Sequence, residues 1–253
     1  MTVNTPKMPN NDRPGIVGLA STYDAETLIA PHAHTAHQIV HAISGTMRVS
    51  VQNLMWFVPP GRAMWIPART DHSIQCVGDV EMRTAYLSEA YPPVQSNVAV
   101  IAVSQLMREI LVRLAEGDGC DDDMKLPLAD VLINEIRQGV LQPLNLPIPG
   151  DPRIAKLARH LQIKPADQTT LKAWAKQLGF SERNLIRVIR VETGMTFREL
   201  RRLTRIMVSL DRLSAGQSVT ETAFDVGFET PSAFIHAFRL LIGKTPRRFM
   251  SGE

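Results

Sequence analysis

The chain has 253 residues, enough for one large domain or two modest ones with separate cores. Its 44% hydrophobic and 21% charged residues are typical of a globular protein, and no apolar run approaches the roughly 20 residues of a membrane-spanning helix. The first residues lack the basic and apolar regions of a signal peptide, and Cys76 and Cys120 are too far apart for a zinc-ligand spacing, so we expect a cytoplasmic protein without membrane contacts.

The net charge of +3 is unevenly divided along the chain. Residues 151–253 contain 18 basic and 10 acidic residues, whereas the first 150 residues contain 10 basic and 15 acidic residues. This asymmetry indicates that the C-terminal part meets a polyanion and that the N-terminal part does not.

The first half of the chain reads as β-structure, after a start at residues 1–15 that we predict to be disordered. Short apolar runs are separated by the turn signals Ser44-Gly45 and Pro59-Pro60-Gly61. The runs predict strands at residues 38–43, 47–51 and 55–58. Strands at this spacing, with turns between them, indicate an all-β barrel or sandwich over residues 16–93.

We predict residues 94–141 to be helical. Apolar side chains recur there at steps of three and four, which places them on one face of each of two helices. The two stripes are Ala99, Val103, Leu106, Ile110 and Leu114, and then Leu128, Leu132, Ile136 and Val140. Stripes this apolar pack on the barrel or form the seam of a dimer. We expect a homodimer, because two linked copies of a binding site increase the overall affinity.

Residues 142–150 contain three prolines and a glycine and are predicted to be an interdomain linker. Asp151 and Pro152 then begin a helix, because aspartate can cap free N–H groups and proline at the first helical position loses no hydrogen bond. Everything from residue 151 to residue 253 reads as helix and turn.

Two segments of this helical region share one plan. In the first, a short amphipathic helix from Leu171 ends at Gly179, and Ser181 caps a second helix. In the second, the helix from Val219 leads to Gly227, and Thr230-Pro231 opens the next. The plan predicts two helix-turn-helix units.

Residues 197–213 predict one long helix between these units. Such a helix would fix the separation of two reading helices, which can enter successive major grooves when they are held about 34 Å apart. The alternative is a plain helical bundle with two incidental hairpins.

Residues 169–249 resemble the DNA-binding domain of the AraC/XylS family of transcription regulators. The resemblance lies in LKAWAKQLGFSERNLIRVIRVETGMTF and, after it, SVTETAFDVGFETPSAFIHAFRLLIGKTPRRF, which match in order and spacing. It implies a transcription regulator with an all-α double helix-turn-helix domain at residues 151–253. Double-stranded DNA is then its partner, and RNA polymerase is a further candidate.

The same resemblance implies which residues read DNA. On the first reading helix, which starts at Ser181, they are Arg183, Ile186 and Arg187; on the second they are Thr230, Ser232, Ala233 and His236. An arginine can contact guanine through two hydrogen bonds, worth ~1–3 kcal/mol of discrimination. Other basic residues would touch phosphates or pack within the domain: Arg205, Arg239, Lys244, Arg247 and Arg248.

Histidines cluster in the β-rich half: His32, His34, His37 and His41, with His72 downstream. Their spacing resembles the two motifs of the cupin barrel, His32-x-His34-x3-Gln38-x6-Gly45 and Gly61-x5-Pro67-x4-His72. Gln38 stands where metal-binding cupins usually have glutamate, and Arg69 where the second motif usually has glycine. The expected fold is therefore α+β with two domains, a cupin-like barrel plus helices followed by the all-α domain.

Three interpretations of the histidines stay open. They line a pocket for a small-molecule effector, they hold a divalent metal, or they are a structural remnant. The pocket set is His32, His34, His37, Gln38, Trp65 and His72, and the metal set is His32, His34 and His72. The resemblance favours a small-molecule effector with no required cofactor, and we expect no enzyme activity. The rival function is a metal-dependent cupin enzyme or a metal-responsive regulator.

Overall fold

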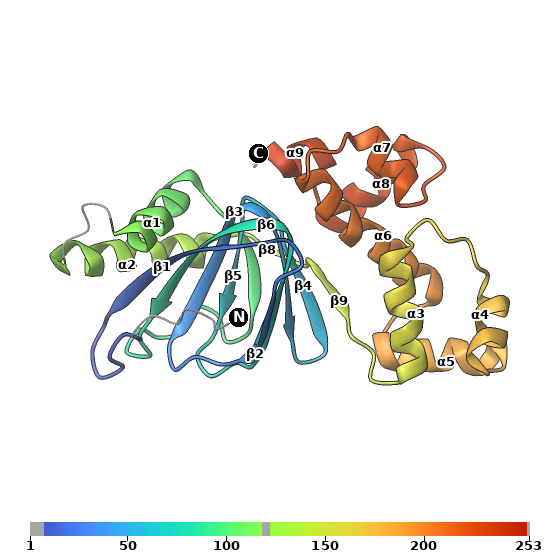
Figure 1. The fold of residues 1–253 in the computed structure, drawn as a ribbon, viewed down its shortest axis with the longest axis horizontal. Helices are drawn as coiled ribbons and strands as arrows, with labels where there is room; N and C mark the ends of the chain where they lie inside the picture. The colour runs from blue at the N-terminus through green and yellow to red at the C-terminus, as the bar shows by residue number, and fades with distance from the viewer. Residues whose placement is uncertain (1–7, 118–121, 252–253) are drawn as a thin grey trace. The chain divides into compact units, whose positions relative to one another are not determined.

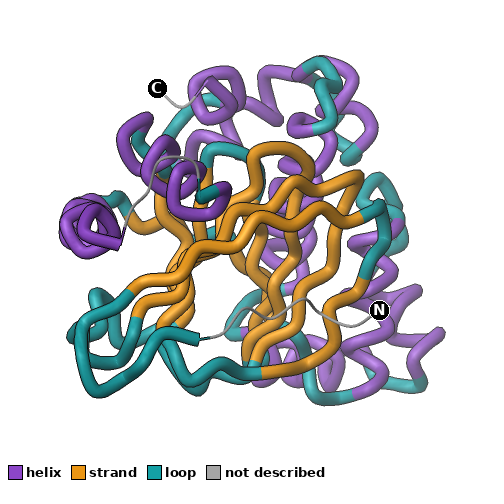
Figure 2. Tube along the Cα trace, turned by 60° about the vertical axis from the view of Figure 1, so that its left-hand side comes forward, coloured by secondary structure: helices purple, strands orange, loops and turns teal. Residues whose placement is uncertain are grey.

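The computed structural model describes residues 8–117 and 122–251. Contacts divide the chain into two units, one formed by residues up to 52 with 56–144, and the other by residues 53–55 with 145–251. The first unit is a curved sheet with two helices, and the second is helical (Figures 1 and 2). The predicted fold class is confirmed. In the described residues, no helix combines the length and the apolar character needed to cross a membrane.

The strands form one antiparallel-paired sheet with the order β1-β6-β3-β5-β7-β8, while β2 pairs with β6, and β4 pairs with β3 and β9. Their bounds are β1 Ile16–Tyr23, β2 Leu28–His32, β3 His37–Val51, β4 Leu54–Val58, β5 Arg62–Ile66, β6 His72–Leu87, β7 Ala99–Ala102, β8 Leu141–Gln142 and β9 Asn145–Pro147.

The two longest strands, β3 and β6, pair along their whole length, from His37 opposite Leu87 to Val51 opposite His72. The predicted turn at Ser44-Gly45 is wrong, because β3 continues through it with a register shift on each side of Ser44. Gly45 has a φ of 74°, and a side chain there would overlap the Asp79 carbonyl. Glycine in this conformation forms a β-bulge as readily as a turn.

The predicted helix from Ala99 is also wrong at its beginning. Val100 pairs with Met64 of β5, so residues 99–102 form the strand β7. The helix α1 (Gln105–Glu116) starts only after Ser104, whose hydroxyl accepts a hydrogen bond from the Met107 N–H. The second helix, α2 (Asp122–Gln138), follows, and both pack on one face of the sheet (Figure 1).

Two segments, the predicted linker at residues 142–150 and the predicted disordered start at residues 1–15, make ordered contacts over part of their length. Within residues 142–150, β8 pairs with β7 and β9 pairs with β4. Residues 1–7 lie outside the described residues, but the Asn11 side chain donates hydrogen bonds to the Thr35 carbonyl and the Glu89 carboxylate at 2.9 and 3.2 Å. Cys76 is buried in β6, and Cys120 lies outside the described residues.

The second unit contains the predicted helices. A capping hydroxyl precedes five of them, at Thr170, Ser181, Thr196, Ser218 and Thr230. The helices are α3 Pro152–Ile163, α4 Leu171–Leu178, α5 Glu182–Thr193, α6 Phe197–Ser214, α7 Val219–Asp225, α8 Pro231–Ile242 and α9 Pro246–Ser251.

Each helix-turn-helix unit has its own core on α6. The core of the first unit joins Trp174, Leu185 and Leu200. That of the second contains Phe234 and Phe238, whose rings meet edge to face at 5.7 Å. The long helix α6 thus carries one packed unit near each end (Figure 1).

Gly18 of β1 lies where α1 packs against the sheet, so a substitution there tests this packing. A Cβ at this position would overlap the backbone carbonyl of Leu114, so Gly18→Ala must displace α1 from β1. We expect the free energy of unfolding, measured by urea titration, to fall by roughly 1–3 kcal/mol.

The matched control is Gly15→Ala, whose Cβ would meet Pro9 at 3.4 Å and the Arg13 carbonyl at 3.9 Å, both ordinary contacts or nearly so. This change should alter stability by less than about 0.5 kcal/mol. Equal stability of the two variants would contradict the close approach of β1 and α1.

Candidate DNA-reading helices and histidine site

The helix α5 turns its apolar side chains inward and its predicted reading residues outward. Leu185 and Ile189 are buried, whereas Arg183 and Arg187 are exposed. Ile186, between them on the surface, has an exposed fraction of 51%. An exposed isoleucine flanked by arginines offers DNA both an apolar contact for a thymine methyl group and donors for guanine.

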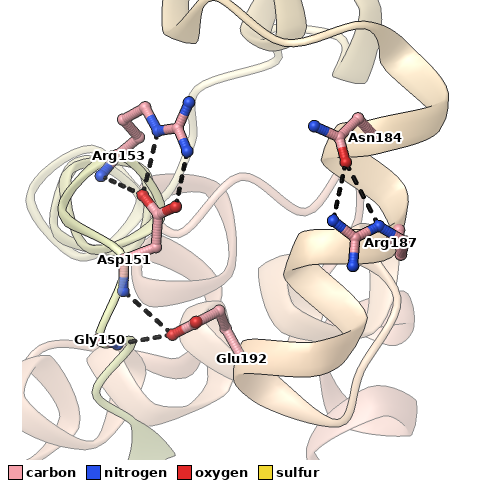
Figure 3. Close-up of polar contacts among 6 residues, drawn as sticks. All are labelled: Gly150, Asp151, Arg153, Asn184, Arg187 and Glu192. Carbon is pink, nitrogen blue, oxygen red and sulfur yellow. Dashed lines mark hydrogen bonds and ion pairs between the residues drawn. The ribbon is translucent and has the colours of Figure 1, made fainter.

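Arg187 is held in place by its neighbour one turn earlier. Its Nη2 and Nε atoms donate hydrogen bonds to Asn184 Oδ1 at 3.1 and 3.3 Å (Figure 3). The other edge of the planar guanidinium group carries the remaining N–H donors. Asn184 was not among the predicted site residues, although its spacing of three residues from Arg187 is a signal that the sequence contains.

The other end of α5 is tied to the segment that leads into the helical domain. Glu192 Oε2 accepts hydrogen bonds from the backbone N–H groups of Gly150 and Asp151 at 2.6 and 3.1 Å (Figure 3). Asp151 also pairs with Arg153 at 2.8 Å, and the hydrogen bonds from Arg153 lower the Asp151 pKa to about 2. The start of α3 and the end of α5 are therefore fixed together.

The second predicted reading helix, α8, begins after Thr230, whose hydroxyl accepts a hydrogen bond from the Ala233 N–H at 3.2 Å. That hydroxyl therefore caps the helix. The other predicted reading residues, Ser232, Ala233 and His236, are exposed, as are the basic residues Arg239, Lys244, Arg247 and Arg248. Arg205 is half-buried and donates a hydrogen bond to the Pro165 carbonyl, so it packs within the domain.

Three histidines come together in the first unit. His32 of β2 lies opposite His72 of β6, and their ring centres are 4.3 Å apart. The ring centre of His34 is 4.8 Å from that of His32 and 5.5 Å from that of His72. One nitrogen from each ring can be chosen so that all three lie within 4.8 Å of one another.

The hydrogen bonds of these rings set their chemistry. The Nδ1 atoms of His32 and His72 lie 2.8 Å from the carbonyl oxygens of Ala30 and Thr70, so each Nδ1 carries a proton and donates it. The Nε2 atoms of His34 and His72 are buried and have no hydrogen-bond partner in the described part of the chain. Neutral rings with a free Nε2 lone pair are the form in which histidine binds metals.

The pKa values of two of these histidines also favour the neutral form of the ring. Burial, together with the neighbouring His32 and His72, lowers the pKa of His34 to about 4. Burial also lowers the pKa of His72. At neutral pH both of these imidazoles are therefore uncharged.

The other predicted pocket residues lie in two different surroundings. His37 stacks on Trp65 at 5.2 Å, and Trp65 belongs to the core beneath α1 and α2. Gln38 instead donates a hydrogen bond to the Tyr86 hydroxyl at 3.4 Å, and the Tyr86 ring lies 5.0 Å from that of His34. Neighbouring residues of a strand point to opposite faces. His37 and Gln38 therefore cannot line one pocket.

Comparison with known proteins gives two domain matches. Residues 21–87 match the cupin domain, and residues 174–252 match a helix-turn-helix domain. The chain is 29% identical to the HTH-type transcriptional regulator NimR of Escherichia coli K12 over 246 residues, which cover 96% of this chain and 90% of that protein.

Two further matches are more limited, the first in the length it covers and the second in sequence identity. The HTH-type transcriptional regulator RipA of Corynebacterium glutamicum is 36% identical over 107 residues, covering 42% of this chain and 32% of that protein. The solved structure of ToxT from Vibrio cholerae O395 is 11% identical, covers 94% of this chain and 97% of that one, and has a TM-score of 0.40.

A cupin domain followed by paired helix-turn-helix units defines a two-domain transcription regulator. The helix-turn-helix match is of the AraC type, and it stands in this chain beside a cupin match. NimR and RipA are both named as transcriptional regulators.

The lowered pKa of His34 predicts a loss of stability in acid. Between pH 6.5 and about 4 the unfolded chain binds a proton at His34 that the folded protein does not, so the free energy of unfolding falls as the pH falls through this range. At about pH 5 this one group should remove about 2 kcal/mol of the stability present above neutral pH.

Urea unfolding of metal-free protein at about pH 5 and at a pH above neutral measures this loss of stability. His34→Gln should lose about 2 kcal/mol less than the wild type between them. The control is His236→Gln, at an exposed position, which should behave as the wild type. A wild-type pH dependence in His34→Gln would contradict the lowered pKa.

Proposed function

We propose that this protein binds specific DNA sequences with α5 and α8 and that a ligand in its barrel controls this binding. One observation carries the proposal: both helices begin at a capping hydroxyl and present their predicted reading residues on the surface, from units packed on one helix. The 18 residues of α6 span about 27 Å, comparable with the roughly 34 Å between successive major grooves.

The two reading helices contribute unequally. Arg183 and Arg187 on α5 can each read guanine through two hydrogen bonds, with Ile186 as an apolar neighbour. On α8, Ser232, Ala233 and His236 offer shorter or less selective contacts. The half-site that faces α5 should therefore tolerate fewer base changes.

Control by the barrel requires a ligand that binds two states of the protein with different affinity. We further propose a homodimer formed through α1 and α2. Apolar side chains on these helices are exposed, and burying them would stabilise a dimer: Leu106, Met124, Leu126 and Val131. Contact with RNA polymerase and a cytoplasmic location stay predictions.

Arg187→Ala tests the assignment of α5. The loss of a two-point contact to guanine, worth ~1–3 kcal/mol, should weaken binding roughly 5- to 150-fold. Footprinting on a site that the wild-type protein selects from randomised DNA measures this. The control is Arg159→Ala, which removes an exposed charge from α3 and should change affinity only slightly. Unchanged protection by Arg187→Ala would remove this residue from the reading surface.

One observation favours a divalent metal as the ligand of the barrel. The buried Nε2 atoms of His34 and His72 lack partners among the residues described, and His32 lies beside both. Three imidazole nitrogens fit zinc, cobalt or nickel. His32, His34 and His72 would hold the ion, which would supply positive charge inside the barrel. The sequence favours an organic effector at the same site, and the metal is the second candidate.

Cobalt(II) added to the tag-free full-length protein tests the metal. We expect visible absorption from cobalt bound to imidazole, and His34→Gln or His72→Gln should lower the affinity at least about tenfold. His37→Gln is the matched control, because His37 lies on the opposite face of its strand from Gln38, and should bind as the wild type. No absorption with the wild type would exclude the metal, and equal loss in His37→Gln would show that the ligand set is wrong.

A further inference from the structure

Four arginines follow one side of α6 in its N-terminal half. Arg198, Arg201, Arg202 and Arg205 recur at steps of three, one and three, which brings their side chains together. Like charges at this spacing repel one another, so the arrangement destabilises the free helix. A bound anion would remove that penalty.

The four arginines line a cavity of about 290 Å³ together with Gln168 and Phe228, and we call this the α6 arginine cavity. Gln168 belongs to the loop between α3 and α4, and Phe228 belongs to the turn between α7 and α8. The cavity therefore lies where the two helix-turn-helix units meet on α6. Its volume is close to that of the smaller pockets that take small molecules.

Two of the guanidinium groups are fixed in this cavity. Arg201 Nη2 donates a hydrogen bond to the Thr169 carbonyl. Arg205 Nε donates one to the Pro165 carbonyl at 2.9 Å, and its guanidinium carbon lies 5.8 Å from the centre of the Phe228 ring. The loop before α4 and the second turn thus hold both arginines in position before any ligand arrives.

These contacts leave charge and donors uncompensated. Arg201 Nε and Arg205 Nη2 are buried and have no hydrogen-bond partner within residues 8–117 and 122–251. Asp167 acts electrostatically on both arginines, but its carboxylate also accepts a hydrogen bond from the Thr169 N–H at 2.8 Å and contacts His160 at 3.3 Å. Glu199 acts electrostatically on Arg202, and the four arginines outnumber these two carboxylates.

We propose that the α6 arginine cavity binds a phosphate group. Guanidinium groups match phosphate oxygens through paired hydrogen bonds, and partly buried donors strengthen such contacts. A phosphodiester of the DNA backbone and the phosphate of a free small molecule offer the same oxygens. In the first case the inference deepens the proposed DNA binding, and in the second it stands apart from it.

The first arm of the test uses a random-sequence DNA duplex, the full-length chain and the double variant Arg198→Gln/Arg202→Gln. Both residues are exposed at the rim of the cavity, so the variant should keep the fold, which thermal unfolding checks. If the phosphate belongs to DNA, the slope of log affinity against log salt should fall by about 0.9, the value for one lost phosphate contact. The charge-matched control is Lys156→Gln/Arg159→Gln on α3, which should lower the slope much less.

The second arm adds pyrophosphate without DNA and follows the melting temperature and the heat of binding. If the phosphate belongs to a small molecule, pyrophosphate should bind saturably to the wild type and to the α3 control, and at least about tenfold more weakly to the α6 variant. A loss confined to the duplex arm identifies backbone phosphate, and a loss confined to pyrophosphate identifies a free ligand.

If the α6 variant loses both duplex contacts and pyrophosphate binding, the site is also supported, as one that binds the phosphate of DNA and of a free ligand alike. Equal behaviour of the α6 and α3 double variants in both arms overturns the inference. Neither arm needs a specific DNA sequence. A wild-type protein that protects no site in footprinting would contradict the proposed function without deciding this one.

Discussion

The close contact of Gly227 with Ala166 and Arg205 controls how the two helix-turn-helix units are joined. Gly227 has a φ of 88°, and a Cβ there would lie 2.6 Å from the Cα atom of Ala166 and 2.9 Å from Arg205 Nη2. Only glycine both adopts this conformation readily and leaves the space free. The turn of the second unit therefore rests on the loop before the first, and α6 alone does not determine the relation between α5 and α8.

In the first unit, one strand connects the histidine site with the helices proposed for dimerisation. β6 begins at His72 beside His32, and it ends at Leu87 in the core beneath α1 and α2. A ligand that moves the His72 backbone would act on the same continuous strand that supports these helices. This gives the proposed control by ligand a physical route inside the barrel domain.

The sequence predicted best what short-range chemistry decides. Gly179, Ser181 and Thr230 end or cap helices through contacts a few residues away, so the helix-turn-helix boundaries could be predicted. The bulge at Gly45 could not, since glycine serves turns and bulges alike and the distant pairing with β6 selects between them. The strand β7 likewise depends on pairing with β5. The arginine cavity needs three separate segments to converge, and periodicity along one helix contains no such information.

The pairing of Arg187 with Asn184 has a consequence for the entropy of recognition. A free arginine side chain has about 2 kcal/mol of rotamer entropy to lose when it is immobilised against a base. Asn184 restricts Arg187 before DNA arrives, and it does so through one edge of the guanidinium group, leaving donors on the other edge for a base. Part of the ordering that binding would otherwise impose is thus already present in the folded protein. If Arg187 reads a base as proposed, Asn184 would contribute to affinity without touching the base itself.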